Sequence, residues 1–411
     1  MSSVVLIHAN ALAIPLREKS VHCCVCSPPY FGLREYGIAP WLWGGDASCD
    51  HAWNITISSN RGHAGNRSTL VGTQTAPLSK DATIPTCVCT RCGGWQGTLG
   101  NESLHDCLAW ARGEEPCSQC YVCHIRTIGT ELWRVLRDDG TFWLNCGDSH
   151  AGSGVHAAHH ANPGLSRAAT RNAAVATPVP PGFKSKNLLG IPWRVALALQ
   201  QDGWILRSDI IWHSPNKMPE SVQDRPTRAH EHIFLFAKKP RYYYDAMAIT
   251  EPAMTGWNNS SFTSAHDIIT KPGLGQGART ERMTRNARNV WTFPTSPFVG
   301  EHYAAFPSEL ARRCILAGTS QAGCCPQCGK PWIQQVERQR VLDGHIPVSG
   351  AFSRPDEPFR IPPNGRGHAR YSTQRTEHGW LPTCACNAGE PHPCVVFDPF
   401  VGSGTTLLVA R

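Results

Sequence analysis

The sequence predicts an α/β fold with a mostly parallel, doubly wound sheet. Short apolar runs at 21–26 and 141–146 alternate with segments of helical periodicity, and another apolar run at 395–397 leads into a glycine-rich turn. Strands that alternate with helices in this way form sheets covered by helices. Irregular stretches separate these elements and are too long for structureless loops, which indicates inserted domains.

The regular elements begin with Val21–Cys26, an apolar run expected to form a buried strand. A helix should follow, because apolar residues recur at helical spacing; they are Ile125, Ile128, Leu132, Val135 and Leu136. This pattern stops at Asp139-Gly140, which reads as a helix end and a turn. The run 141–146 (TFWLNC) is then expected to be a buried strand.

The second half of the chain repeats this alternation. A helix that ends at Gly203 is indicated by four apolar residues; they are Leu188, Ile191, Val195 and Leu199. Strands are expected over 204–212 and 233–237, and Pro307 opens a helix that reaches Ile315.

Composition excludes several classes of protein. The chain has 411 residues, 41% of them hydrophobic, and no stretch approaches the roughly 20 uninterrupted apolar residues of a membrane span. Nineteen cysteines without an export signal favour thiols and metal sites in a reducing cytosol over disulfides. The excess of 39 Lys and Arg over 31 Asp and Glu is compatible with a phosphate-bearing partner.

The first motif with chemical meaning is Ser27-Pro28-Pro29-Tyr30, directly after the first strand. Loops at the carboxyl ends of parallel strands are where α/β proteins bind ligands. The prolines lack backbone donors and leave carbonyl oxygens facing the site. The set suits a flat heterocycle with an exocyclic amine, whose hydrogens Ser27 Oγ and the Pro28 carbonyl would accept while Tyr30 stacks on the ring.

The second motif reads DPFVGSGTT over residues 398–406, after the strand expected at 395–397. Its glycines let the backbone approach a ligand closely, and the helix start that follows favours a carboxylate or phosphate. A dinucleotide site with G-x-G-x-x-G spacing is excluded, because Leu407 occupies the third glycine position.

With SPPY near the N-terminus and DPFVGSGTT near the C-terminus, the chain resembles S-adenosylmethionine-dependent amino-methyltransferases of DNA in the beta order, particularly their phage and prophage branch. The resemblance implies a Rossmann-like methyltransferase sheet in which Ser27, Pro28, Pro29 and Tyr30 are catalytic. It also implies a set of cofactor-binding residues, in the glycine turn and in a second segment; they are Asp398, Pro399, Phe400, Gly402, Ser403, Gly404, Thr405, His302, Phe306 and Pro307.

The implied reaction is methyl transfer to an exocyclic amine of a base flipped out of double-stranded DNA. Such a transfer needs alignment and the removal of water rather than an enzyme nucleophile. Ser at the first motif position leans toward cytosine-N4, with adenine-N6 as the alternative. Methylation of RNA or of a protein glutamine is a further enzyme reading. A zinc-stabilised DNA-binding protein with an inactive, truncated transferase domain is the alternative from another class. A modification enzyme of this kind is expected in the cytoplasm of a bacterium or a phage-infected host.

Cysteine and histidine residues form sets with the composition of structural zinc sites, which need four ligands. One set contains a knuckle-like CxxC pair and comprises Cys325, Cys328, Cys384 and Cys386. Another comprises Cys49, His51, Cys89 and Cys92, with Cys87 as a possible replacement for Cys49 or His51. Cys107, Cys117, Cys120 and Cys123 are a third candidate set.

Basic residues indicate where phosphates would bind. The region 252–290 lies where the family carries target recognition, and its expected DNA contacts are Arg282, Arg285 and Arg288. Other cations surround the later strands, about half of them expected to be merely solvated; they are Lys184, Lys186, Lys217, Arg225, Arg228, Lys238, Lys239 and Arg241.

These readings divide the chain into seven segments. The expected domains are the first part of the methyltransferase core with the catalytic loop (1–37), a Cys-rich insert (38–123), the methyltransferase core (124–251), a target-recognition region (252–300), a cofactor-binding helix segment (301–318), a Cys-rich zinc-ribbon-like insert (319–394) and a truncated cofactor-binding glycine turn (395–411).

The resemblance also implies that the cofactor half is incomplete at the C-terminus. A full family member would continue past residue 411 to another strand and an acidic residue for the cofactor ribose. On that expectation the strand at 395–397 lies at a sheet edge. The 411-residue chain would then bind S-adenosylmethionine poorly and methylate slowly or not at all.

Overall fold

The computed structural model describes residues 4–32, 40–57, 85–102, 107–151, 183–252, 284–295, 306–346 and 368–411. The chain forms two compact units. The first comprises residues 1–244, 288–319 and 393–411, and the second comprises 245–287 and 320–392. None of the helices in the described ranges has the length and apolar character needed to span a membrane.

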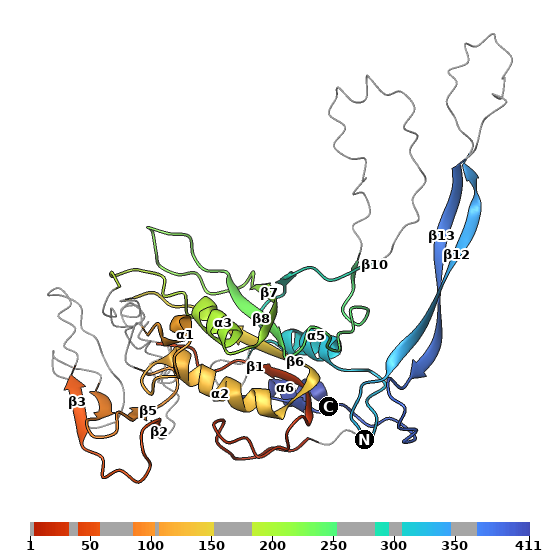
Figure 1. Cartoon of the computed structure of the whole chain (residues 1–411). Coiled ribbons are helices and arrows are strands. Elements are labelled where there is room, and N and C mark those ends of the chain that lie inside the picture. The colour runs from red at the N-terminus through yellow and green to blue at the C-terminus, as the bar shows by residue number, and fades with distance from the viewer. Residues whose placement is uncertain are drawn as a thin grey trace, which may run out of the picture. The chain divides into compact units, whose positions relative to one another are not determined.

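A six-stranded sheet is the centre of the first unit (Figure 1). Its strands, in spatial order, are β11 (Val290–Thr292), β7 (Ile205–His213), β8 (His230–Ala237), β6 (Leu136–Cys146), β1 (Val21–Cys26) and β14 (Val396–Phe397). All the sequence-predicted strands belong to it, and β14 is the last described strand at one edge, as expected. The central strands β1 and β6 are almost entirely buried.

The sheet is mixed, but the prediction of a mostly parallel sheet is confirmed, because every strand except β8 runs in the same direction. β1 runs parallel to β6 and β14, and β7 runs parallel to β11. β8, however, runs antiparallel to both β6 and β7. The segment 214–229 joins β7 to β8 without a helix, and a connection of this kind leads back along the neighbouring strand in the opposite direction.

The helices of this unit are α1 (Ala109–Arg112), α2 (Tyr121–Val135), α3 (Ile191–Gln201), α5 (Ser308–Gly318) and α6 (Thr405–Ala410). α2 packs on α3, whereas α5 packs on α6 and β1. The predicted end of the helix at Asp139-Gly140 is wrong: α2 ends at Val135, and Leu136 already has extended backbone angles. Asp139-Gly140 instead lies in a register shift of β6 against β1, between the pairs Val21–Leu136 and Cys23–Thr141.

The first cysteine-rich insert contributes a small antiparallel sheet to the first unit. Its strands are β2 (Trp41–Trp43), β3 (Trp53–Ile57), β4 (Pro85–Cys89) and β5 (Trp95–Gly97), in the order β2-β5-β4-β3. Trp43 and Trp95 belong to the same buried hydrophobic cluster as β1 and α2. The insert therefore shares the core of the main sheet.

The second unit consists mainly of a long, twisted hairpin of β12 (Ile333–Ile346) and β13 (His368–Leu381) (Figure 1). Cys324 forms backbone bridges with Pro331 and His392 beside the hairpin's first residues. A short pair, β9 (Glu251–Pro252) with β10 (Thr284–Arg285), completes the described part of this unit.

Candidate active site

The two sequence motifs begin at the ends of adjacent parallel strands. Cys23 and Cys24 of β1 pair with Val396 and Phe397 of β14, so the loops that start at Ser27 and Asp398 leave the same edge of the sheet. Thr406, in the second loop's helix, lies with its Oγ1 3.5 Å from the carbonyl oxygen of Val25. The sequence prediction that these motifs share one site is therefore compatible with the topology.

Tyr30 is the centre of a hydrogen-bond network that reaches across three strands. Its hydroxyl donates to Glu231 Oε2 of β8 at 2.6 Å and accepts from Asn145 Nδ2 of β6 at 2.7 Å. Ser27 Oγ donates to the same hydroxyl oxygen at 3.3 Å. Lys217 Nζ completes the network with a 2.9 Å ion pair to Glu231 Oε1. The tyrosine ring is thus fixed from its polar end.

The network sets the protonation states of its two acids. Burial, followed by the nearby charge of Glu231, raises the pKa of Tyr30 well above its ordinary value, so the phenol keeps its proton at neutral pH. Burial also acts to raise the pKa of Glu231, but the charge of Lys217 and the hydrogen bonds from Tyr30, Lys217 and Asn145 outweigh it. The pKa of Glu231 is lowered, and the group is a carboxylate.

The backbone beside the Tyr30 ring is close-fitting. A Cβ atom placed on Gly147 would lie 2.6 Å from Cε2 of the Tyr30 ring, closer than carbon atoms can approach. Asn145 is 2% exposed, and its Oδ1 is buried with no hydrogen-bond partner among the described residues. Unpaired buried acceptors are uncommon and cost roughly 1–3 kcal/mol, which marks a position shaped by function.

The loop that begins at Ser27, which the sequence predicts to be catalytic, is held by the first cysteine-rich insert. Gly32 N donates to the carbonyl oxygen of Gly100 at 2.8 Å. Tyr121, the first residue of α2, donates its hydroxyl to the carbonyl oxygen of Pro29 at 2.9 Å. A Cβ at Gly100, which has a positive φ of 97°, would lie 3.1 Å from the Tyr30 carbonyl oxygen. Only glycine allows this close approach without strain.

Asp398 shapes the glycine turn through its own carboxylate. Oδ1 accepts from the Phe400 N–H at 2.9 Å, and Oδ2 accepts from Thr406 Oγ1 at 2.7 Å. Burial raises the pKa of Asp398 to about 6, although the hydrogen bonds from Thr406 and Phe400 act to lower it. Both oxygens are therefore used inside the loop, so Asp398 supports the turn from beneath.

The other residues expected to bind cofactor lie around this turn. Gly402 and Gly404 have positive φ angles of 50° and 78°, and Ser403 Oγ lies 3.0 Å from Thr405 Oγ1. A Cβ at Gly404 would meet nothing within 4 Å, so the backbone there borders open space. Phe306 and buried Pro307 precede α5, which packs on β1 and α6, and Pro307 is its N-cap residue. His302 lies outside the described residues.

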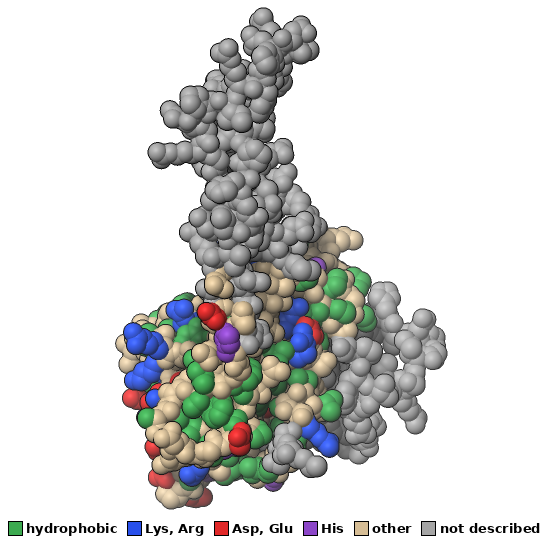
Figure 2. Space-filling model, turned by 90° about the vertical axis from the view of Figure 1, so that its right-hand side faces the viewer, with side chains coloured by type: hydrophobic (Ala, Val, Ile, Leu, Met, Phe, Trp, Pro, Cys, Tyr) green, Lys and Arg blue, Asp and Glu red, His purple; other side chains and the backbone are tan. Residues whose placement is uncertain are grey.

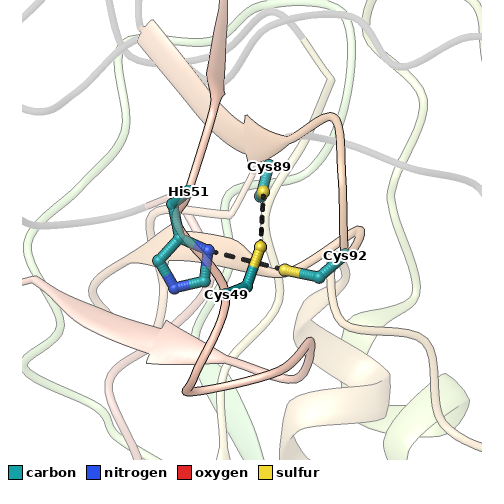
Figure 3. A group of neighbouring side chains, drawn as sticks. All are labelled: Cys49, His51, Cys89 and Cys92. Carbon is teal, nitrogen blue, oxygen red and sulfur yellow. Dashed lines mark hydrogen bonds between the residues drawn. The ribbon is translucent and has the colours of Figure 1, made fainter.

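The cysteine-rich segments assemble the two predicted metal-ligand sets. In the first unit Cys49, His51, Cys89 and Cys92 come together with all ligand atoms within 4.8 Å of one another (Figure 3). Cys49 Sγ lies 3.9 Å from Cys89 Sγ, and Cys92 Sγ lies 3.5 Å from His51 Nδ1. In a tetrahedral zinc site these separations would be about 3.8 and 3.6 Å. The Cys87 side chain lies outside the described part of the structure.

The second unit assembles the other predicted set, Cys325, Cys328, Cys384 and Cys386, within the same limit. The structure also brings together Cys107, Cys117, Cys120 and Cys123 in the first unit. All three sets are four-ligand sets without carboxylates, the donor chemistry of structural zinc rather than of catalytic zinc.

The basic residues expected to contact DNA do not form one continuous positive surface among the described residues. Arg282 lies outside the described residues, Arg285 uses its Nε in a 2.7 Å ion pair with Glu251, and Arg288 is exposed. Lys186, Lys217, Arg225, Arg228 and Lys238 of the other basic group also pair with carboxylates. On the face drawn in Figure 2, the visible Lys and Arg side chains are scattered among acidic and hydrophobic ones.

Sequence reasoning missed Asn145, Glu231 and Tyr121 as parts of the site. Asn145 is a polar residue inside the otherwise apolar strand segment TFWLNC, whereas Glu231 lies between two histidines at the start of HEHIFLFA. A signal was therefore available for Asn145, because a polar residue in a buried strand needs a partner. Tyr121 gave no comparable signal, since it begins an amphipathic helix with an ordinary apolar face.

Comparisons with known proteins identify the relatives of this chain. A family model described as DNA methylase, of the N6 and N4 type, matches residues 21–325. The type II methyltransferase M.Cfr9I of Citrobacter freundii is 43% identical over 323 residues, which are 78% of this chain and 74% of that protein. M.XycI of Xanthomonas campestris pv. cyanopsidis, also a type II methyltransferase, is 35% identical over 76% of this chain and 72% of its own length.

Among solved structures, a PvuII DNA methyltransferase described as cytosine-N4-specific covers 76% of this chain and 70% of its own. Its TM-score is 0.35 and its sequence identity 13%. A likeness at this level carries no argument about the site.

Proposed function

This chain belongs to the N6/N4 family of amino DNA methyltransferases, which use S-adenosylmethionine, and we propose that it methylates cytosine-N4 at a specific site in double-stranded DNA. The proposal includes a role as the type II modification enzyme of a restriction-modification system in the cytoplasm of a bacterial or phage-infected cell. The relatives named above are type II methyltransferases, which supports this role. The single observation that carries transfer to an exocyclic amine is the state of Ser27 beside Tyr30, and the choice of cytosine rests on the serine at this motif position.

Ser27 is prepared to accept hydrogen bonds from an amine. Its Oγ proton is directed to Tyr30 Oη at 3.3 Å, and the Tyr30 proton is directed to Glu231 Oε2 at 2.6 Å. The lone pairs of Ser27 Oγ are therefore left for an N–H donor from the substrate. A base inside a duplex cannot reach this loop, so the target cytosine must be flipped out.

The same three residues form a route for the surplus proton. Methylation leaves the target nitrogen with one proton more than the product needs. Ser27 Oγ accepts that proton as it passes its own to Tyr30 Oη, which passes its proton to the Glu231 carboxylate. One N–H bond is broken, one carboxyl O–H bond is formed, and the negative charge of Glu231 is neutralised. Lys217 keeps Glu231 ionised beforehand.

The glycine turn fits the methionine end of S-adenosylmethionine. Asp398 holds the turn from within, and the backbone of Gly404 borders open space at the edge shared with Ser27. When bound, S-adenosylmethionine supplies an electrophilic methyl group, so the chain needs no nucleophile of its own. We propose that Phe400, Gly402, Ser403, Gly404 and Thr405 line this end. Pro399, Phe306, Pro307 and His302 remain proposed contacts.

The nucleoside product tests the base assignment. Methylated DNA is digested to nucleosides and examined by mass spectrometry, and N4-methylcytosine is expected. N6-methyladenine would favour the adenine alternative instead. DNA binding without methylation or S-adenosylmethionine binding would favour the DNA-binding protein with an inactive transferase domain.

Single substitutions test the proton route. Ser27→Ala and Glu231→Gln should each lower turnover by at least about a hundredfold, the contribution typical of positioned acid–base groups. Affinity for DNA should stay within a few fold, because phosphate contacts supply most of it. Ser20→Ala, an equally small change before the same strand, is the control. Full turnover in Glu231→Gln would exclude the relay.

Structural zinc is the second part of the proposal. Cys49, His51, Cys89 and Cys92 would hold one ion, and the separations in this set match a tetrahedral site. Cys325, Cys328, Cys384 and Cys386 would hold another. Protein purified under reducing conditions should contain at least two zinc ions per chain, and a chelator should lower its melting temperature. Less than one ion per chain would contradict the assignment.

Target recognition is proposed for 252–300, with Arg282, Arg285 and Arg288 as contacts. The remaining domain boundaries proposed from the sequence, at 37, 123, 251, 300, 318 and 394, also stay proposals. Binding should weaken steeply with salt, because Lys and Arg release counterions from DNA. If the Arg282→Ala and Arg285→Ala variants keep both the methylated sequence and the affinity, recognition lies in another segment.

A further inference from the structure

We infer that Cys107, Cys117, Cys120 and Cys123 bind a third zinc ion, and that this ion positions the catalytic loop. The four sulfur atoms lie within 4.8 Å of one another, and Cys107 Sγ is 3.8 Å from Cys123 Sγ. Two thiolates on one tetrahedral zinc ion stand about 3.8 Å apart, whereas a disulfide would bring two sulfurs to about 2.05 Å. The spacing fits a shared metal ion.

The backbone around this cluster also has the form of a metal loop. Cys120 is the N-cap residue of α2, and its Sγ accepts from the Cys123 N–H at 3.4 Å. Arg91 N donates in the same way to Cys89 Sγ, also at 3.4 Å, in the histidine-containing set. Cys107, Cys120 and Cys123 are at most 9% exposed, so the four-thiol set is an interior feature of the first unit. Without a metal ion, four thiols have no strong attraction that would bring them together.

The cluster is joined to the catalytic loop through the first turn of α2. Tyr121 lies between ligands Cys120 and Cys123 and is 2% exposed. Its hydroxyl donates to the Pro29 carbonyl at 2.9 Å, and its ring packs at 5.7 Å from that of Phe31. A metal ion that fixes Cys120 and Cys123 thereby fixes the donor that holds the residue between Pro28 and Tyr30.

A second connection runs through a buried acid and histidine. His124 follows Cys123, and its Nδ1 lies 2.8 Å from Glu102 Oε1. Glu102 Oε2 accepts from the Gly100 N–H at 2.8 Å, and Gly100 in turn accepts from Gly32 of the catalytic loop. The loop is thus held at two points by residues next to the cluster: Tyr121 contacts Pro29, and the chain of contacts from His124 reaches Gly32.

The third ion would also be coupled to the histidine-containing zinc set. Ser118, between Cys117 and Cys120, donates its Oγ to the Gly93 carbonyl at 2.6 Å, directly after Cys92. Its own carbonyl lies 2.9 Å from His124 Nε2. Hydrogen bonds consequently connect the two cysteine-rich loops, at 89–92 and 117–120, with the loop that begins at Ser27.

Cadmium substitution of the wild-type protein tests the metal without any variant that could misfold. The 113Cd NMR shift distinguishes four-sulfur sites from sites with three sulfurs and one nitrogen. We expect two four-sulfur resonances and one of the mixed type, and native mass spectrometry should count three zinc ions per chain. One four-sulfur resonance with two zinc ions would overturn the inference, whatever the methylation assay shows.

Two variants locate the ion and its effect. Cys117→Ser, which changes the most exposed ligand, should lower the zinc count by one. Cys314→Ser, in buried α5 and outside every ligand set, is the matched control and should keep three. A zinc count of three in Cys117→Ser would contradict the ligand assignment.

The positioning role, which rests on the proposed function, is tested with Tyr121→Phe. This variant removes the hydrogen bond to Pro29 but keeps the ring and the metal. Turnover should fall about tenfold, the usual effect of leaving a buried acceptor unpaired. The zinc count and the dissociation constant for S-adenosylmethionine should not change. Turnover within twofold of wild type would show that the loop does not depend on α2.

Discussion

The two cysteine-rich inserts contain the same ligand chemistry but stand in different relations to the rest of the protein. The insert at 38–123 buries Trp43 and Trp95 in the main core. It donates one hydrogen bond to the loop that begins at Ser27, from Tyr121, and accepts one from that loop at Gly100. The insert at 319–394 assembles its cysteines in a separate unit beside a long hairpin with Ile333 and Leu381 exposed. Two inserts with the same ligand chemistry can therefore either share the main core or belong to a unit of their own, and only their contacts distinguish the two.

The largest effect should come from removing the metal ligands of each insert in turn. Cys89→Ser with Cys92→Ser should lower turnover by at least about a hundredfold, because small displacements of catalytic groups cost this much. Cys325→Ser with Cys328→Ser should leave turnover at saturating DNA within a few fold, since this set belongs to the other compact unit and sites without shared partners are largely independent. Single-turnover methylation assays measure both.

Equal losses in the two double variants would remove the distinction between the inserts. A loss confined to the second insert would reverse it. Zinc counts on both variants confirm that each change removed a metal ion, so that an unchanged rate cannot be attributed to a retained ion.

A buried and an exposed histidine–glutamate pair offer a smaller but cleaner contrast. His124 and Glu102 have side chains only 2% and 0% exposed, and both nitrogens of His124 face oxygen acceptors. Trp43 stacks on the imidazole at a centroid distance of 4.1 Å. His124→Ala should therefore cost about 3–5 kcal/mol in the free energy of unfolding, because it leaves Glu102 buried without its partner.

The matched variant in the second insert is His378→Ala. Its ion pair with Glu337 has a similar length, 2.9 Å, but the two side chains are 41% and 64% exposed. Surface pairs contribute at most about 1 kcal/mol. Denaturant unfolding followed separately for each unit measures both values, and a large loss for His378→Ala would show that the hairpin is more tightly integrated than its exposure indicates.

The smallest effect is expected for the arginines near target recognition. Arg288 is exposed and should contribute about one phosphate contact, so Arg288→Ala should reduce the salt dependence of DNA binding by about one unit. Arg285 is already paired with Glu251, so Arg285→Ala should change that slope less. Equal slopes for both variants would show that the Glu251 pair opens when DNA binds.

The sequence was most informative where local pattern decides structure. Val21–Cys26 forms a strand over the predicted residues, and the CxxC pairs fall into the predicted metal sets. The strand follows from neighbouring residues alone, and each CxxC pair places two ligands within one turn of the chain. The reversed direction of β8 was not predicted, although the connection at 214–229 shows no helical periodicity and parallel neighbours usually need a helical crossover.

The sequence also could not predict which residues meet at the Tyr30 hydroxyl, even where a polar residue in a buried strand indicated that a partner exists. Asn145, Lys217 and Glu231 come from β6, the β7–β8 connection and β8, and only the folded sheet brings them to one hydroxyl. The sequence also did not indicate that Phe400 and Thr406 use both carboxylate oxygens of Asp398. Such loop-internal bonds depend on backbone geometry that residue types do not specify.

The close fit between Gly147 and the Tyr30 ring suggests a variant that could be used to map the target sites on DNA. A single methyl group at this position, Gly147→Ala, would displace the tyrosine while leaving the phosphate contacts and the metal loops unchanged. Such a protein would occupy its recognition sequence without modifying it. Crosslinked to genomic DNA and sequenced, it would map every target site of the enzyme, and in a living cell it would shield those sites from their own modification.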